Sequence, residues 1–125
     1  MPALTDEVLV AWENRDGPVV LATVDKNGIP NAIYASCVSK YDQETLIVAD
    51  NYFDKTRKNI MSGSQASLLF LTKDRKSYQI KGEIQYHSEG VYYDDMKRWN
   101  DTRHPGHAAA VIKVAQVFKG SKQLV

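Results

Sequence analysis

The sequence predicts a mainly β fold: a six-stranded antiparallel split β-barrel, Greek-key-like, flanked by about three short helices. Apolar, β-branched runs recur along the chain, and the turn signals between most of them are too short for the helical crossovers of parallel strands. Six strands also leave few protected edges, and closure into a small barrel removes the unpaired ones. At 125 residues and 43% hydrophobic composition, the chain is expected to form a single domain over 1–125 with a substantial core.

The first half of the chain predicts a helix followed by strands in hairpins. Thr5 is placed to cap a helix that carries Trp12, with Leu4 and Leu9 as a hydrophobic staple and Gly17 ending it. Strands are expected over 19–24 and 31–38, because the turn sequence Asp-Lys-Asn-Gly separates them. A second turn at 41–44 leads into a third strand over 46–50.

The second half predicts three more strands and two helices. A helix begins at Lys55 and is closed by Gly63, and strands over 66–72 and 77–86 flank the polar turn 73–76. Gly82 marks a bulge or bend in the longer of these strands. Ser88 is placed to cap a helix over 91–99, and a final apolar strand covers 108–118.

The stretch 45–63 carries the strongest functional signal, because a buried strand leads directly into a helix whose first turn is cationic and bears a hydroxyl group. Asp54 is a good N-cap residue, and Lys55 and Thr56 follow it. The unpaired N–H groups of such a turn, together with the helix dipole, attract an anion such as phosphate. Many ordinary surface helices begin in the same way, so the motif by itself leaves solubility as the alternative.

Composition and charge narrow the function classes. Sixteen basic and fifteen acidic residues are scattered along the chain and give a net charge of +1, which argues against a nucleic-acid partner. No apolar run approaches the roughly 20 residues of a membrane span, and the first residues do not resemble a secretion signal, so a cytoplasmic location is expected.

The single cysteine, Cys37, is expected to be a small core residue. His104 and His107 bracket Pro-Gly without a ligand set, so no metal site is expected, and spacing alone singles out no catalytic residue.

The order of elements resembles a known family. The chain resembles the FMN-binding split-barrel family related to pyridoxamine 5′-phosphate oxidase, above all its short bacterial FMN-binding proteins. The resemblance lies in the order strand, Asn-Gly turn, strand, turn, strand and a helix beginning with lysine, and in a later long strand reading Tyr-Gln-Ile-Lys-Gly-Glu-Ile. The similarity covers about 17–118. It implies an FMN cofactor at the interface of a homodimer, an unidentified redox partner, and a role in electron transfer or as a small flavin-dependent oxidoreductase.

The resemblance also implies a set of cofactor-binding residues. Lys55 and Thr56 match positions that hold the flavin phosphate, and the strand end before them lies against the flavin. Trp99 and Phe118 are aromatic candidates to cover the ring from a partner subunit, although Trp99 could be a core residue, Phe118 a dimer contact, and Gln79 a solvent-facing side chain. The full set comprises Ile33, Tyr34, Ala35, Ser36, Val48, Ala49, Asp50, Asn51, Lys55, Thr56, Gln79, Trp99 and Phe118.

The sequence departs from the larger oxidases at several points. Ile33 and Val38 stand where those enzymes have an arginine and a lysine, and Asp54 stands where an arginine precedes the lysine. The sequence stops at Val125, without the arginine- and tryptophan-bearing tail of the oxidases, so oxidation of pyridoxamine phosphate is not expected. The alternatives are a split-barrel module for haem, a deazaflavin or a nucleotide phosphate, and a structural or regulatory dimer with an empty groove.

Overall fold

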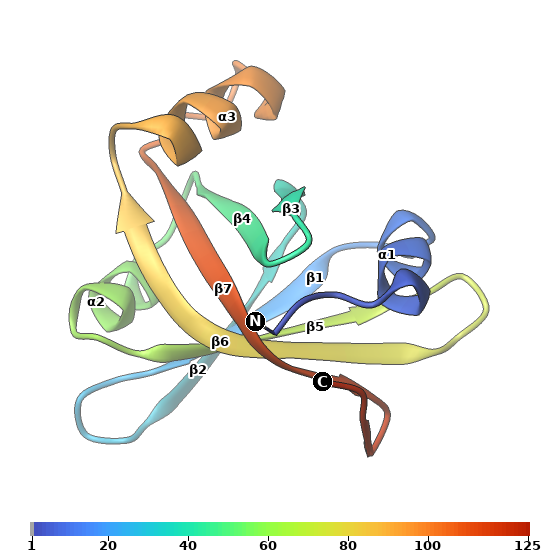
Figure 1. Ribbon diagram of the computed structural model, residues 1–125. Coiled ribbons are helices and arrows are strands. Elements are labelled where there is room, and N and C mark those ends of the chain that lie inside the picture. Colours follow the sequence, from blue (N-terminus) through green and yellow to red (C-terminus); the bar gives the residue numbers. More distant parts are fainter. Residues whose placement is uncertain (1) are drawn as a thin grey trace.

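The structure is a computed structural model that describes residues 2–125, and it consists of one antiparallel sheet with three helices around it (Figure 1). The helices are α1 (Asp6–Glu13), α2 (Lys55–Met61) and α3 (Val91–Trp99). The strands are β1 (Val19–Val24), β2 (Pro30–Ala35), β3 (Val38–Asp42), β4 (Thr45–Asp50), β5 (Gln65–Leu71), β6 (Ser77–His87), β7 (Ala108–Lys119) and β8 (Lys122–Gln123). The strand order is β2-β1-β5-β6-β7-β4-β3, with β8 paired to β7.

The sheet curls into a half-barrel, and its two edges are strands that follow each other in the sequence (Figure 1). The mainly β, antiparallel class is confirmed, but the expected number of six strands is wrong, because the described chain forms eight. The single strand expected over 31–38 is divided at Ser36 and Cys37, and the short β8 follows β7. The expected removal of the edges is also wrong, because among the described residues no ladder joins β2 to β3.

The division of this segment has a simple cause in the pairing. β2 pairs with β1 up to the partners Val19 and Ala35, whereas β3 pairs with β4 from the partners Val38 and Val48. The chain therefore leaves one end of the sheet and joins the other within two residues. The opening of the half-barrel lies where it does so.

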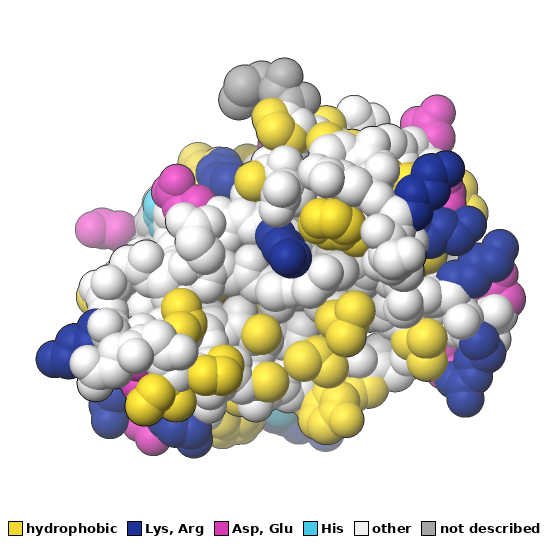
Figure 2. Space-filling model, turned by 90° about the horizontal axis from the view of Figure 1, so that it is seen from below, with side chains coloured by type: hydrophobic (Ala, Val, Ile, Leu, Met, Phe, Trp, Pro, Cys, Tyr) yellow, Lys and Arg dark blue, Asp and Glu magenta, His cyan; other side chains and the backbone are white. Residues whose placement is uncertain are grey.

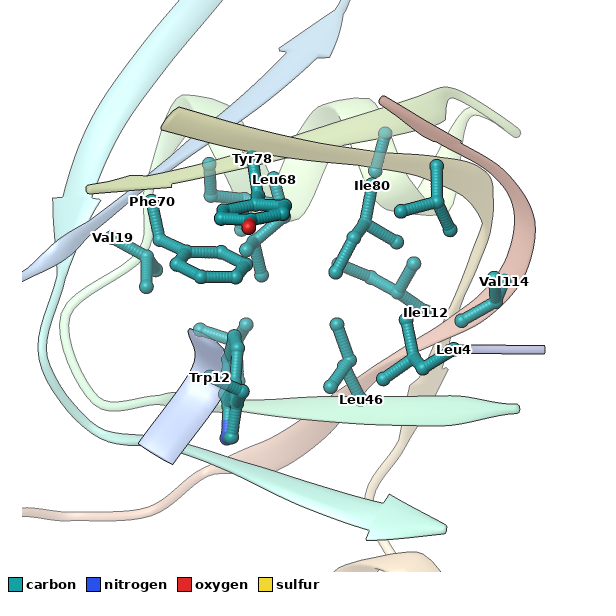
Figure 3. Packing of buried hydrophobic residues seen from close by; sticks show 14 of the residues in the cluster. Leu4, Trp12, Val19, Leu46, Leu68, Phe70, Tyr78, Ile80, Ile112 and Val114 are labelled. Carbon is teal, nitrogen blue, oxygen red and sulfur yellow. The ribbon is translucent and has the colours of Figure 1, made fainter. Parts of the chain in front are cut away.

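Helix α1 packs on the half-barrel through Trp12, as Figure 3 shows. The Thr5 side chain accepts a hydrogen bond from the Val8 amide, so the predicted cap is confirmed, although the helix ends at Glu13 and not at Gly17. The Trp12 ring meets Phe70 edge-on at 5.3 Å between centroids, and Phe70 stacks on Tyr78 at 5.4 Å. These aromatic contacts add specific geometry to the apolar burial that holds α1 in place.

Gly82 lies at the predicted irregularity of β6. The register between β6 and β7 shifts between Lys81 and Gly82, and a Cβ atom at Gly82 would stand 1.8 Å from the carbonyl oxygen of Lys113. Only glycine permits this close approach of two backbones. The bulge allows β6 to bend along the curved sheet.

Helix α3 covers the other end of the sheet, near β3 and β4 (Figure 1). Its N-cap position is Gly90, without a side-chain cap, so the cap expected from Ser88 is wrong. Met96 is fully buried in a small second cluster with Ile47 and Val111. None of the helices described within 2–125 is both long enough and apolar enough to cross a membrane.

Candidate functional site

A groove of about 310 Å³ lies at the opening of the half-barrel. Edge strand β2 forms one wall, the two-residue link to β3 continues it, and the end of β4 with the start of α2 forms the other wall. In an edge strand, alternate residues direct their N–H and C=O groups away from the neighbouring strand and leave them free for a ligand. The lining residues are Asn31, Ile33, Tyr34, Ala35, Ser36, Cys37, Ala49, Asn51, Tyr52, Phe53, Asp54, Lys55, Thr56 and His104.

The first turn of α2 supplies the cationic end of the groove. Lys55 is exposed and has no carboxylate within 4.0 Å among the described residues, so its ammonium is available to an anion. Thr56 is 99% buried, and its hydroxyl oxygen accepts a hydrogen bond of 3.1 Å from the Asn31 amide. Asn31, which sequence reasoning missed, therefore connects β2 to the start of α2 at this end.

The aspartate expected to cap α2 does not do so. Asp54 occupies the N-cap position, but its side chain makes no cap hydrogen bond and instead lies 3.6 Å from the Lys58 ammonium. The preceding strand end supplies the ordering carboxylate, because Asp50 accepts a hydrogen bond of 3.0 Å from the Phe53 amide. The predicted N-cap position of Asp54 is therefore confirmed, but the capping hydrogen bond expected of its side chain is absent.

Asp50 is fully buried and forms the centre of a polar network below the groove. Arg57 donates to its two carboxylate oxygens from Nε at 2.8 Å and from Nη2 at 3.2 Å, and the Tyr86 hydroxyl donates at 2.6 Å. Burial by itself raises the pKa of the Asp50 carboxyl, but hydrogen bonds from Arg57, Tyr86 and the Phe53 amide outweigh it and hold that pKa below its ordinary value. The Asp50 carboxylate raises the pKa of Arg57 in turn. The Asp50 side chain does not line the groove, so it contributes to the site indirectly, by ordering the loop before α2.

A pair of asparagines fixes the loop that closes the mouth of the groove. Asn51 and Asn100 exchange amide hydrogen bonds of 3.2 and 2.9 Å, and the Asn51 oxygen also accepts from the Gly106 amide at 3.0 Å. This loop carries His104, whose Nδ1 lies 3.1 Å from the Tyr52 hydroxyl. The Asn51 backbone N–H donates to the Ala49 carbonyl oxygen at 3.1 Å.

Sequence reasoning identified most of the groove but not all of it. Eight of the thirteen expected cofactor-binding residues line it: Ile33, Tyr34, Ala35, Ser36, Ala49, Asn51, Lys55 and Thr56. Cys37, expected in the core, is only half-buried and also lines the groove. The missed His104 lies close to Tyr52 only in the folded chain, and the sequence carries no local signal for it.

The other expected residues lie elsewhere. Val48 is fully buried in the core, and Trp99 borders a smaller hollow that shares Ser36 and Cys37 with the groove. Gln79 and Phe118 are opposite each other on β6 and β7, on the outer face of the sheet. The Gln79 amide there donates to the Ser67 hydroxyl at 2.7 Å.

Comparisons of the whole chain with known proteins agree with this architecture. A family model described as pyridoxamine 5′-phosphate oxidase matches residues 5–120. An uncharacterised protein of Methanocaldococcus jannaschii, MJ0282, is 30% identical over 120 residues, which cover 92% of this chain and 79% of that protein.

Solved structures share the fold. HupZ of Group A Streptococcus superposes with a TM-score of 0.85 at 27% identity, and the match covers 98% of both chains. An FMN-binding protein from Syntrophomonas wolfei gives 0.77 at 23% identity, over 92% of this chain and 83% of that one. The heme storage protein HutZ of Vibrio cholerae gives 0.70 at 19% identity, over 94% and 96%.

Proposed function

This chain belongs to the pyridoxamine 5′-phosphate oxidase family, and we propose that it is an FMN-binding flavoprotein that acts in electron transfer or as a small flavin-dependent oxidoreductase. One observation carries the proposal: a single groove combines an unpaired lysine at one end with free edge-strand backbone along its wall and aromatic side chains at its mouth. A phosphate, a polar ribityl chain and a flat ring need these three kinds of environment.

Each part of this cofactor has candidate partners among the chain's own residues. Lys55 would hold the phosphate, with Asn31 and Thr56 beside it. Backbone groups of β2 and of Ser36 would meet the ribityl chain and the polar edge of the ring, while Ala49 leaves room for a flat ring to approach β4. FMN would supply the hydride or single-electron chemistry, and the protein would orient it and restrict access of water.

The size of the groove suggests that one chain does not enclose the cofactor. Ligand sites range from about 300 to 1,000 Å³, and about 310 Å³ lies at the lower end of that range. A second wall from another copy of the chain would complete the site. The homodimer therefore forms part of the proposal.

The outer face of the sheet offers a surface for this dimer. Direct antiparallel pairing aligns Tyr34, Val20, Leu69, Gln79 and Phe118 in one row across four strand boundaries, and we call them the outer row. Opposed residues of paired strands point to the same face. Seen from below, the molecule has hydrophobic side chains across the middle of its surface and most charged ones near the margin (Figure 2). The outer row begins at the groove, so a partner on this face would bring its own Gln79 and Phe118 near the cofactor.

A different ligand is the second candidate, and His104 is the observation that favours it. Its imidazole lines the mouth of the groove, where it could ligate the iron of a haem, and the fold is shared with a heme storage protein. A deazaflavin or a nucleotide phosphate would use the Lys55 end instead. In these cases the protein would bind its ligand without FMN redox chemistry.

The visible spectrum of the purified protein after gel filtration separates the candidates. A flavin spectrum that bleaches with dithionite supports the proposal, and a Soret band supports the haem alternative. A colourless protein that binds no FMN on titration would refute the proposal.

Substitution of Lys55 tests where the phosphate lies. A charge-assisted hydrogen bond contributes about 1.5–3 kcal/mol, and the exposure of Lys55 favours the lower value, so Lys55→Gln is expected to weaken FMN about tenfold. Riboflavin lacks the phosphate, so its affinity should not change. Lys73→Gln, in the exposed β5–β6 turn, is the matched control. Equal losses for FMN and riboflavin would show that Lys55 does not contact the phosphate.

A further inference from the structure

The groove does not end at Lys55, because a second hollow of about 380 Å³ adjoins it and shares Lys55 and Asn31 with it. One wall is the β1–β2 turn, with Lys26, Asn27, Ile29 and Pro30. The other wall is a single face of α2, with Lys55, Lys58 and Asn59, continued by the C-cap residue Ser62. We call this hollow the turn pocket.

The turn pocket is cationic. Three lysines line it, and its one acidic lining residue, Asp25, directs a carboxylate oxygen to the Asn27 and Ile29 amides at 2.8 and 2.9 Å. Lys26 has no carboxylate within 4.0 Å in the described part of the chain, and Lys58 has only the exposed Asp54 at 3.6 Å. Positive charge therefore continues beyond the place proposed for the flavin phosphate.

The walls of the pocket also suit a group larger than a free anion. Ile29 is 61% exposed and, with Pro30, forms an apolar rim next to the lysines. Asn59 is buried and fixed by a hydrogen bond of 3.0 Å to the Thr23 hydroxyl, which attaches α2 to β1. The pocket thus lies between elements that are already joined, with amides, cations and an apolar rim in contact with the same space.

We propose that the turn pocket is a subsite for a cofactor extended beyond its first phosphate, in the manner of a flavin dinucleotide. Lys55 holds the first phosphate, Lys58 and Lys26 hold the second, and the adenosine lies on Ile29 and Pro30. The inference rests on the proposed flavin function and extends it, since a flavin dinucleotide would use both the groove and the turn pocket.

Parallel titrations with riboflavin, FMN and FAD, followed by flavin fluorescence, test the inference. The wild-type protein is expected to bind FAD at least as tightly as FMN. The variant with both Lys26→Gln and Lys58→Gln should bind FAD about tenfold more weakly while its FMN affinity stays within twofold, because only the second phosphate loses its partners. Ile29→Ser should weaken FAD alone. Retained FMN binding shows that each variant is folded, and Lys73→Gln again serves as the control.

The outcomes separate this inference from the function on which it rests. Tight FMN binding with weaker FAD binding would refute the turn pocket as a subsite and leave the FMN proposal intact. An equal loss for FMN and FAD in the double variant would also refute it. If no flavin binds, the proposed function fails and the subsite fails with it.

Discussion

The buried Asp50 network offers the sharpest test of how the fold supports the site. Asp50→Asn keeps the size of the side chain but removes its charge, and its new NH₂ group would face donors on Arg57 and Tyr86. A hydrogen bond to a charged group contributes about 1.5–3 kcal/mol, and loss of one partner of a buried pair costs about 3–5 kcal/mol. Arg57 is 38% exposed and can recover hydration, so the lower end of these ranges applies.

The expected loss for Asp50→Asn is therefore about 3 kcal/mol in the free energy of unfolding. For a chain of 125 residues this corresponds to a fall in Tm of about 10 °C. Urea and thermal denaturation followed by circular dichroism measure both quantities. Asp54→Asn, an exposed change four residues away, is the control and should stay within about 0.5 kcal/mol of the wild type.

The pH dependence gives a second readout of the same carboxylate. Its pKa in the folded protein lies below the unfolded value of 3.8, so its contribution is fully present well above that value and is lost as pH falls below it. The difference in stability between the wild type and Asp50→Asn should accordingly shrink below about pH 4. Two results would refute the view that the Asp50 charge orders the loop before α2. One is a free energy of unfolding for Asp50→Asn within about 1 kcal/mol of the wild-type value at pH 7. The other is a difference between the two proteins that does not change with pH.

Three further changes test the bulge, the loop at the mouth and the dimer surface. Gly82→Ala places a Cβ atom 1.8 Å from the Lys113 carbonyl oxygen and should lower the free energy of unfolding by about 3 kcal/mol in a urea titration. A loss below about 1 kcal/mol would contradict this. Asn51→Ala leaves the Gly106 backbone amide without its hydrogen-bond partner. We expect the free energy of unfolding to fall by about 2 kcal/mol and hydrogen exchange across 101–107 to become faster. Unchanged exchange would show that the asparagine pair does not hold the loop. Leu69 belongs to the outer row and is 42% exposed, so Leu69→Glu should convert a dimer into a monomer in sedimentation velocity. The control Val10→Glu, on α1, should leave the dimer intact. If the dimer survives both changes, its interface lies on another face.

The strands were predictable because their signals are local. Alternating burial along β5 and β6, the Asp-Lys-Asn-Gly turn and the Thr5 cap each depend on residues a few positions apart. The resemblance then located the groove, because the order of elements determines which strand ends come together. The divided strand was missed because nothing near Ser36 shows that β3 pairs at the far end of the sheet from β2.

The missing cap hydrogen bond of Asp54 shows where local sequence signals fail. Asp50 and Asp54 lie four residues apart before and at the start of α2, and by propensity Asp54 is the better N-cap. Their roles are decided by Tyr86, a residue of β6 that meets Asp50 only after the sheet has formed, and by Arg57, which turns back onto it. Asn31 and His104 were missed for the same reason, since their partners are 25 and 52 residues away.

The separated edges β2 and β3 have a consequence for solution behaviour. Unpaired strand edges are templates on which other chains can add, and here the edge strand β2 lines the groove. A ligand in the groove would shield part of this template as well as shifting the folding equilibrium by mass action. Occupancy of the site would then act as protection against aggregation. Incubation near the midpoint of unfolding, with and without saturating FMN, should show slower growth of light scattering in the loaded sample, and equal rates would count against this shielding.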